Sequence, residues 1–394
     1  QPLIPRDTLF ILCALYVVAV LVSIISPTSR VEILSGPIVA VNCMALVWLC
    51  LALVDSRRSV RRVVGAMVAA GVVTALVGFI QAYTHFTWPA STLAEAQAHA
   101  FTRSKPLLDL HGWMGVFRID SITGTPDFLG VAMMTLMPFV ICWGLRQRRV
   151  EGRVAALAVL AILSVAHVLS FTRGALVITP LVLLVTVWLI SRKYVLPMAF
   201  GLVAALLVML TWTPLRERIL AIFALTRSSA TGELDAGAWR LHVVPTAFEM
   251  MWQRPFLGVG SEQQVHNWPS SAGDLVPLTV PGIAPPLHNA YLLAGVELGL
   301  AGLAIVLALV FTTLIRLGKL ARRFERRGEL ELASYAKAAF AAFGGLMLAC
   351  MLYPLLGTYR YFWLLIGLAA ALSRLERALP DPESPILYPA GVER

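Results

Sequence analysis

Long apolar runs recur along the whole chain, and they constrain its fold more than any other feature of the sequence. A run of roughly 20 apolar residues spans a bilayer as a helix, in which the backbone polar groups bond to one another. Only 14% of the residues are charged, whereas ordinary globular chains carry about 25%. We therefore predict an all-α polytopic membrane protein in which residues 1–394 form a single transmembrane domain with about ten or more helices. The ten predicted spans lie at about 8–26, 33–54, 63–83, 128–145, 154–171, 174–190, 195–213, 289–315, 338–356 and 361–373.

The first run, 8–26, stands where a signal peptide would stand, but no small-residue cleavage site follows it and further spans do. The chain begins with Gln1 in place of Met, so we expect native sequence to be missing before it. All five cysteines lie inside predicted spans, and a disulfide framework is therefore not expected.

Lys and Arg are divided unequally between the two sides of the predicted membrane domain. The segments 55–62, 146–153, 191–194 and 316–337 fall on one side and hold 17 Lys and Arg residues in 42 positions. The opposite side holds 11 in about 130 positions. Because short positive loops remain in the cytoplasm, the dense set predicts the cytoplasmic side. The net charge of +10 then reflects topology, so no nucleic-acid partner is expected. The cluster 316–327 is interpreted as a positive-inside signal rather than as a site for anionic lipid.

Two connections on the opposite, outer side are long, at about 84–127 and 214–287, and we predict both to be periplasmic. No internal repeat is present, so an inverted-repeat transporter has no support. The second loop contains an apolar stripe at helical spacing, which predicts an amphipathic helix lying on the membrane or on the bundle. The stripe consists of Trp239, Val243, Ala247, Met250 and Met251. We expect Pro245 to kink this helix, Arg254-Pro255 to end it and 258–260 to form a turn.

Arg173 lies in a minimal outer turn between two apolar spans. Taken alone, snorkelling to the headgroups explains it equally well. Positive charge is sparse on this side, however, and a guanidinium held there could bind a lipid-linked phosphate through two hydrogen bonds. Arg240 lies on the predicted amphipathic helix. Taken alone, it is better explained as a solvated or lipid-facing charge.

His288 stands where a proline-rich loop enters an apolar span. Its alternative role is to cap that span. The positive end of the helix dipole disfavours imidazolium, which keeps the ring neutral, as a general base must be. Asn289 would serve as the N-cap or bond the imidazole. Glu297 lies nine residues further on, too far round the helix to touch His288, and it is expected to pair with a buried Arg or to be protonated.

The remaining histidines give no metal-ligand pattern, since His85, His99, His111 and His266 share no suitable spacing. His167, inside a span, is interpreted as a packed, hydrogen-bonded residue. We therefore expect neither a metal nor a cofactor. The predicted substrate-binding residues are Arg173, Arg240, Asn289, Tyr291, Arg118 and Arg360.

Four segments resemble, in the right order, the O-antigen ligase and polymerase superfamily. The signature of that family is similar to HNAYLLAGVELGLAG at 288–302. Its Gly-Thr segment is similar to FRIDSITGTPDFLGVAMM at 117–134, and its Ser/Thr-Arg-Gly-Ala turn to SFTRGALV at 170–177. Its loop helix is similar to AWRLHVVPTAFEMMWQRPFLGVG at 238–260. The chain departs from the family at Asp127, where members commonly have Asn, and in having ten predicted spans where full ligases usually have twelve.

The resemblance implies a GT-C-type membrane glycosyltransferase in the bacterial inner membrane, with its active site facing the periplasm. Arg173, Arg240 and His288 would be the family's functional Arg, Arg and His. The donor would be a glycan on undecaprenyl diphosphate, and the acceptor a sugar hydroxyl of lipid A–core in lipopolysaccharide biosynthesis. His288 would be the general base and the two arginines would hold the diphosphate, giving metal-independent transfer with inversion.

Three alternatives remain open. An O-antigen polymerase would use the same donor with a lipid-linked acceptor. A protein O-oligosaccharyltransferase commonly carries extra sequence after its last spans, where about 20 residues follow here. A transporter of lipid-linked glycan would place binding charge near the middle of the bilayer and would have broken spans.

Overall fold

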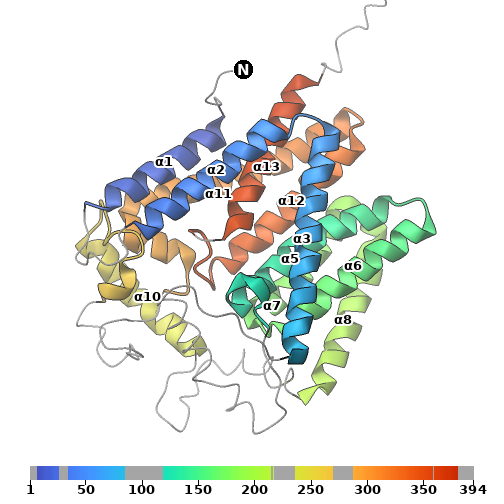
Figure 1. Ribbon diagram of the computed structural model, residues 1–394, viewed down its shortest axis with the longest axis horizontal. Helices are drawn as coiled ribbons and strands as arrows, with labels where there is room; N and C mark the ends of the chain where they lie inside the picture. Colours follow the sequence, from blue (N-terminus) through green and yellow to red (C-terminus); the bar gives the residue numbers. More distant parts are fainter. Residues whose placement is uncertain are drawn as a thin grey trace, which may run out of the picture.

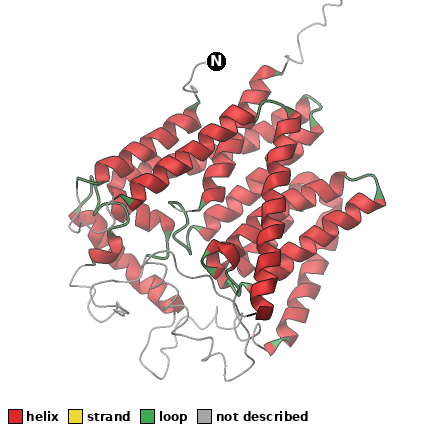
Figure 2. Ribbon diagram, viewed as in Figure 1, coloured by secondary structure: helices red, strands yellow, loops and turns green. Residues whose placement is uncertain are grey.

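The computed structural model describes residues 7–25, 34–84, 119–213, 216, 236–268, 287–357 and 359–379, with the backbone alone for 236–242. Helix is the only regular structure in this part of the chain (Figure 2). Its long helices are α1 (Thr8–Ser23), α2 (Ser35–Leu53), α3 (Arg57–Thr84), α5 (Pro126–Arg146), α6 (Val150–Leu169), α7 (Arg173–Ile190), α8 (Val195–Thr211), α10 (Ala236–Gln253), α11 (Ala290–Arg326), α12 (Leu330–Ala349) and α13 (Arg360–Ala378). Short 3-10 turns are η2 (Ser121–Thr123), η3 (Arg192–Tyr194) and η4 (Gln264–His266).

Each of the ten predicted spans corresponds to one of these helices. Eight of the described helices are long and apolar enough to cross a membrane, which confirms an all-α polytopic membrane protein. The first predicted span is a shorter apolar helix, Thr8–Ser23, and the last, in α13, is not among the eight. Charged residues in its second half, among them Arg374 and Glu376, lower its apolarity.

Helices α5 and α12 form the centre of the bundle. Of the apolar window of each, 78% is buried, compared with 22–39% in α2, α3, α6, α7 and α11 and none in α8. α12 contacts α5, α7, α11 and α13 (Figure 1). Since apolar side chains face lipid as readily as protein in a membrane, close packing rather than apolarity distinguishes this centre.

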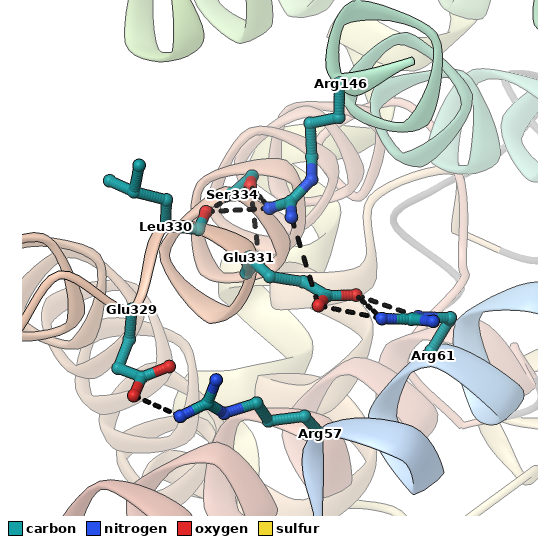
Figure 3. Close-up of polar contacts among 7 residues, drawn as sticks. All are labelled: Arg57, Arg61, Arg146, Glu329, Leu330, Glu331 and Ser334. Carbon is teal, nitrogen blue, oxygen red and sulfur yellow. Dashed lines mark hydrogen bonds and ion pairs between the residues drawn. The ribbon is translucent and has the colours of Figure 1, made fainter. Parts of the chain in front are cut away.

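The basic segments gather at one end of the bundle, which we call the basic end. Glu331, at the start of α12, binds Arg61 of α3 through two hydrogen bonds of 2.9 Å and lies 3.9 Å from Arg146 of α5 (Figure 3). Arg57 of α3 pairs with Glu329, just before α12 (Figure 3). Arg57 and Arg61 are exposed, so these pairs add little stability each. The pairs join α3, α5 and the start of α12 at the level expected for the headgroups.

A second set of ion pairs closes the same end. Asp7 caps α1 by accepting from the backbone N–H of Leu9 at 2.9 Å, and it binds Arg316 of α11 at 2.6 Å. Glu376 of α13 lies 3.4 Å from Arg327. The three dense basic segments and the α7–α8 connection therefore share one end, as the charge distribution predicts.

Helix α11 is interrupted at Gly299, where φ is 71° and ψ is −175°. The break leaves backbone groups of α11 without partners in the helix, and segment 255–260 forms hydrogen bonds with them. The backbone N–H groups of Val259 and Gly260 donate to the carbonyls of Val296 and Glu297 at 2.9 and 3.0 Å, and the N–H of Leu300 donates to Pro255 at 2.7 Å. The predicted span 289–315 lies within this helix apart from its first residue, but hydropathy continues through the break and does not predict it. We call this pairing the helix-break clamp.

The amphipathic stripe of α10 packs on the bundle from Val243 onward, and the side chain of Trp239, its first predicted member, lies outside the described residues. Val243, Ala247, Met250 and Met251 are buried together with Val296 of α11 and Leu287. α10 ends at Gln253, directly before Arg254-Pro255, and Gly258 and Gly260 adopt positive φ in the turn that follows. The opposite face is exposed, with Trp252 at 83%. α10 thus lies beside the first part of α11, away from the N-terminus (Figure 1).

Candidate functional site

Four helices begin close together at the end opposite the basic end, which we call the outer end. The starts of α5 and α7 are joined by a hydrogen bond of 2.8 Å from the hydroxyl of Thr172 to the carbonyl of Pro126. Phe128 of α5 packs edge-on against Tyr359, directly before α13, with ring centroids 5.8 Å apart. Each helix start carries a partial positive charge. The outer end therefore combines several positive dipole ends.

The segment after α12 connects two of these starts. The hydroxyl of Tyr353 accepts a hydrogen bond of 3.0 Å from the N–H of Gly174, in the first turn of α7. The carbonyl of Cys350 accepts one of 2.8 Å from the N–H of Ala290, the first residue of α11. Residues 350–353 thereby place the first turns of α7 and α11 against one short segment.

Arg173 is the first residue of α7 and is half-buried. It follows a tight turn in which Phe171 has φ of 50° and a ring packed on Trp212, with centroids 5.5 Å apart. A bulky residue at positive φ is rare and strained. An Arg at a helix start also opposes the helix dipole. Local helix stability therefore does not account for Arg173.

His288 is half-buried and lies two residues before α11. The residue before it, Leu287, is fully buried and donates its N–H to the side-chain carbonyl of Gln264 at 3.0 Å. The residue after it, Asn289, is the N-cap, and its side-chain oxygen accepts from the N–H groups of Tyr291 and Leu292 at 3.0 and 3.1 Å. The backbone on both sides of His288 is thus fixed.

Tyr291 packs inward, since its hydroxyl donates to the carbonyl of Met347 on α12 at 3.0 Å. Asn289 and Tyr291 therefore have structural roles that sequence spacing does not distinguish from substrate binding. Their predicted part in binding substrate stays a prediction.

The structure describes the other predicted arginines, Arg240, Arg118 and Arg360, to different extents. Arg240 lies in α10, one turn before Val243, whose side chain joins the contact between α10 and α11. The side chain of Arg240 is outside the described residues, and so is Arg118 as a whole. Arg360 is the first residue of α13 and is exposed, and like Arg173 it opposes its own helix dipole.

The side chain of Glu297 is hydrogen-bonded to the backbone of segment 262–264. Its carboxylate accepts hydrogen bonds from the backbone N–H groups of Glu262 and Gln264. Of the two expectations for Glu297, a buried Arg partner or protonation, the first is not met among the described residues, where backbone donors of the turn after the clamp bond to this side chain. The side chain of Gln264 in turn accepts a hydrogen bond from Leu287, the residue before His288. Glu297 is therefore linked to the His288 segment by tertiary hydrogen bonds through Gln264.

His167 is buried and bonded, as predicted. Its Nδ1 lies 2.9 Å from the carbonyl of Gly130 and its Nε2 lies 3.0 Å from the hydroxyl of Thr179. This ring fastens α6 between α5 and α7 beneath the outer turn. Within the described ranges, no three His, Cys, Asp or Glu residues are grouped so that they could hold a metal ion.

Backbone strain concentrates at the outer end. The non-glycine residues with positive φ in the described part of the chain are Ser121, Phe171 and Glu262. They lie in the turn before α5, the turn before α7 and the turn after the clamp. Strained backbone persists where surrounding structure enforces it, and it clusters at functional sites.

The arrangement suits an anionic group and a proton acceptor near one another. Helix starts and arginine side chains supply positive potential for a phosphate. A histidine with its backbone fixed on both sides supplies a base. The fold thus defines an all-α polytopic membrane protein, at whose outer end several helix starts, Arg173 and the segment of His288 lie together.

Comparison with known proteins agrees with this class. Residues 156–307 match the model of a family described as O-antigen ligase. This match supports the resemblance to the O-antigen ligase and polymerase superfamily, and it covers three of the four motifs, at 170–177, 238–260 and 288–302. The matched region contains Arg173, Arg240, the helix-break clamp and His288. No match was found among the curated proteins with which the sequence was compared.

Sequence reasoning missed two residues of the site, Tyr353 and Gln264. Tyr353 falls inside the predicted span 338–356, although α12 ends at Ala349, and Gln264 lies in a polar loop. Neither has a local pattern that marks it, because each acts through a contact distant in sequence.

Proposed function

We propose that this protein is an O-antigen ligase of the bacterial inner membrane. It transfers a glycan from undecaprenyl diphosphate to a sugar hydroxyl of lipid A–core on the periplasmic face. The observation that carries this proposal is the convergence of Arg173, at the start of α7, and the His288 segment on residues 350–353. A lipid-linked diphosphate is an anion at headgroup height, which matches the position and the charge of this end.

In this mechanism the arginines bind the leaving diphosphate. Arg173 and Arg240 hold its oxygens and stabilise the charge that grows on them as the glycosidic bond breaks. Helix starts at the same end add partial positive charge. Because a diphosphate is a good leaving group, no metal is required, and no step uses a cofactor.

His288 acts as the general base. It removes the proton from the acceptor hydroxyl as the oxygen attacks the anomeric carbon, an effect typically worth about 10²–10⁴-fold in rate. Attack opposite the leaving diphosphate inverts the anomeric centre. The proton goes to the imidazole and the electron pair of the broken bond goes to the diphosphate, so charge is balanced.

The orientation of the protein is part of the proposal. The outer end faces the periplasm because the basic segments lie at the other end, and positive segments stay in the cytoplasm. The common end of these segments, fastened by Asp7, Glu331 and Glu376, supports this orientation.

Transport of the lipid-linked glycan is the alternative from another class. The break in α11 is a feature that transporters share. Here, however, the clamp bonds to groups on both sides of the break, and the carboxylate of Glu297 bonds to backbone of the same chain. The break therefore serves to dock 255–264, which favours transfer over transport.

A deletion strain separates the candidate functions. Loss of all O-antigen from lipid A–core, with lipid-linked polymer accumulating, supports the ligase. Lipopolysaccharide with a single repeat would identify a polymerase instead. Unchanged lipopolysaccharide with loss of glycan from proteins would identify an oligosaccharyltransferase that modifies protein.

A further inference from the structure

A cavity of about 830 Å³ lies at the basic end, far from the candidate site. The end of α7, the second half of α11 and the first half of α12 form its walls. Its apolar lining includes Trp188, Ile315 and Phe340. Trp188 and Ile315 are 51% and 56% exposed, so the cavity opens toward the side of the bundle where lipid chains would lie.

Basic side chains line the other part of this cavity. They are Arg192, Lys319, Arg322 and Lys337. One acidic residue lines it as well, Glu325, which pairs with Lys337 at 2.5 Å. Once Glu325 is paired with Lys337, the lining keeps a net excess of three positive charges. The cavity therefore has a positive potential at the level where the bundle meets the headgroups.

Two of the cations are held in place. Arg192 lies over the ring of Trp188, with its guanidinium carbon 5.4 Å from the ring centroid. Arg322 donates from Nε to the carbonyl of Gly318 at 3.3 Å, which leaves the outer nitrogens of the guanidinium for an anion. Side chains that are already ordered lose less entropy when they bind a phosphate.

We propose that this cavity binds an anionic phospholipid of the leaflet at the basic end. The phosphodiester lies among Arg192, Lys319 and Arg322, and the acyl chains run along Trp188 and Ile315. The pairing of an apolar wall with a cationic rim matches the two halves of such a lipid, and basic pockets between membrane helices bind these headgroups. The cluster 316–327 is then more than a topology signal.

The full-length protein in mild detergent provides the test. Native mass spectrometry measures how much phosphatidylglycerol, and how much phosphatidylcholine with the same chains, remains bound. We expect the wild type to retain phosphatidylglycerol preferentially. Arg192→Gln with Arg322→Gln should weaken that binding about 25-fold, at about fivefold for each charge. The control is Arg58→Gln with Arg62→Gln, two exposed cations of the same end outside the cavity, and it should retain the lipid.

A second variant removes space and leaves charge unchanged. Gly318 lines the cavity, and a Cβ there would lie 3.6 Å from the ring of Phe340, so Gly318→Leu fills the site. Gly201→Leu on α8, where a Cβ meets nothing within 4 Å, is the matched control. Loss of phosphatidylglycerol from Gly318→Leu but not from Gly201→Leu supports the site. Equal retention of the two lipids by the wild type, or unchanged retention in the double Gln variant, would overturn it.

Discussion

Tyr353 and Gly174 are 179 residues apart in sequence, yet the hydroxyl of Tyr353 accepts a hydrogen bond of 3.0 Å from the N–H of Gly174. This bond satisfies a donor at the start of α7, where backbone N–H groups lack a partner within the helix. It also ties the residue after Arg173 to the segment that bonds the start of α11. The position of Arg173 relative to His288 therefore depends on Tyr353.

Replacing Tyr353 with Phe tests this dependence. The variant keeps the ring and loses one hydrogen bond, so the midpoint of thermal unfolding should reflect a loss of about 1 kcal/mol. Glycan transfer should fall by about tenfold or more, because misplaced catalytic groups cost far more in rate than in stability. Tyr194→Phe, at the basic end, is the control and should have no effect on transfer. Transfer at the wild-type rate in Tyr353→Phe would remove Tyr353 from the site.

The helix-break clamp depends on glycine at two positions. A Cβ at Gly258 would lie 2.4 Å from the backbone of Glu297, and one at Gly299 would lie 2.5 Å from the carbonyl of Phe256. The φ and ψ of Gly299 also lie in a region that only glycine occupies readily. Gly258→Ala and Gly299→Ala should each destabilise the protein by more than about 1–2 kcal/mol, the cost of positive φ alone.

Thermal unfolding in detergent measures this effect. Gly344→Ala on α12, where a Cβ meets nothing within 4 Å, is the matched control and should unfold like the wild type. Wild-type stability in Gly299→Ala would show that the break in α11 does not need glycine.

The identity of the arginines matters as well as their charge. Lys keeps the charge but lacks the planar fork that binds two oxygens of a phosphate. Arg173→Lys and Arg240→Lys should therefore fold and insert but transfer glycan about tenfold or more slowly. Arg58→Lys, at the basic end, should transfer at the wild-type rate. Full activity in both Lys variants would reduce Arg173 and Arg240 to general surface charge.

Topology can be tested with two exposed positions at opposite ends. All five native cysteines are buried, and the test uses a background in which they are replaced. Gln253→Cys at the end of α10 should react with an impermeant thiol reagent in intact spheroplasts. Ser56→Cys, between α2 and α3, should react only after lysis. The reverse labelling pattern would mean that the protein has the opposite orientation in the membrane, which would contradict the proposed mechanism.

The sequence predicted the helices well because apolar runs and charge bias are local signals. Val243, Ala247, Met250 and Met251 revealed a helix face, and Asn289 revealed a cap, for the same reason. The break at Gly299 was not predicted, since the apolar run continues through it and glycine is common in membrane helices. Segment 255–260 bonds to the backbone groups at the break, and that contact is tertiary.

The site shows the same division. Arg173 and His288 were predicted from their positions at span ends and from family motifs, and their roles stay predictions. Gln264 and Tyr353, which fix the backbone beside them, carry no local pattern. The backbone partners of Glu297 were not among its two expected roles, a buried Arg partner or protonation, because sequence spacing cannot show that a distant turn offers its backbone N–H groups.

The central claim is that His288 removes the acceptor proton, and His288→Gln tests it most directly. Gln can hydrogen-bond but cannot accept a proton at neutral pH, and the cap at Asn289 should keep α11 intact. With purified protein, lipid-linked donor and lipid A–core acceptor, we expect transfer to fall by about 10²-fold or more. Donor binding should change less, since the arginines hold the diphosphate. Transfer by His288→Gln at close to the wild-type rate would contradict the account and leave His288 as a residue that positions the acceptor.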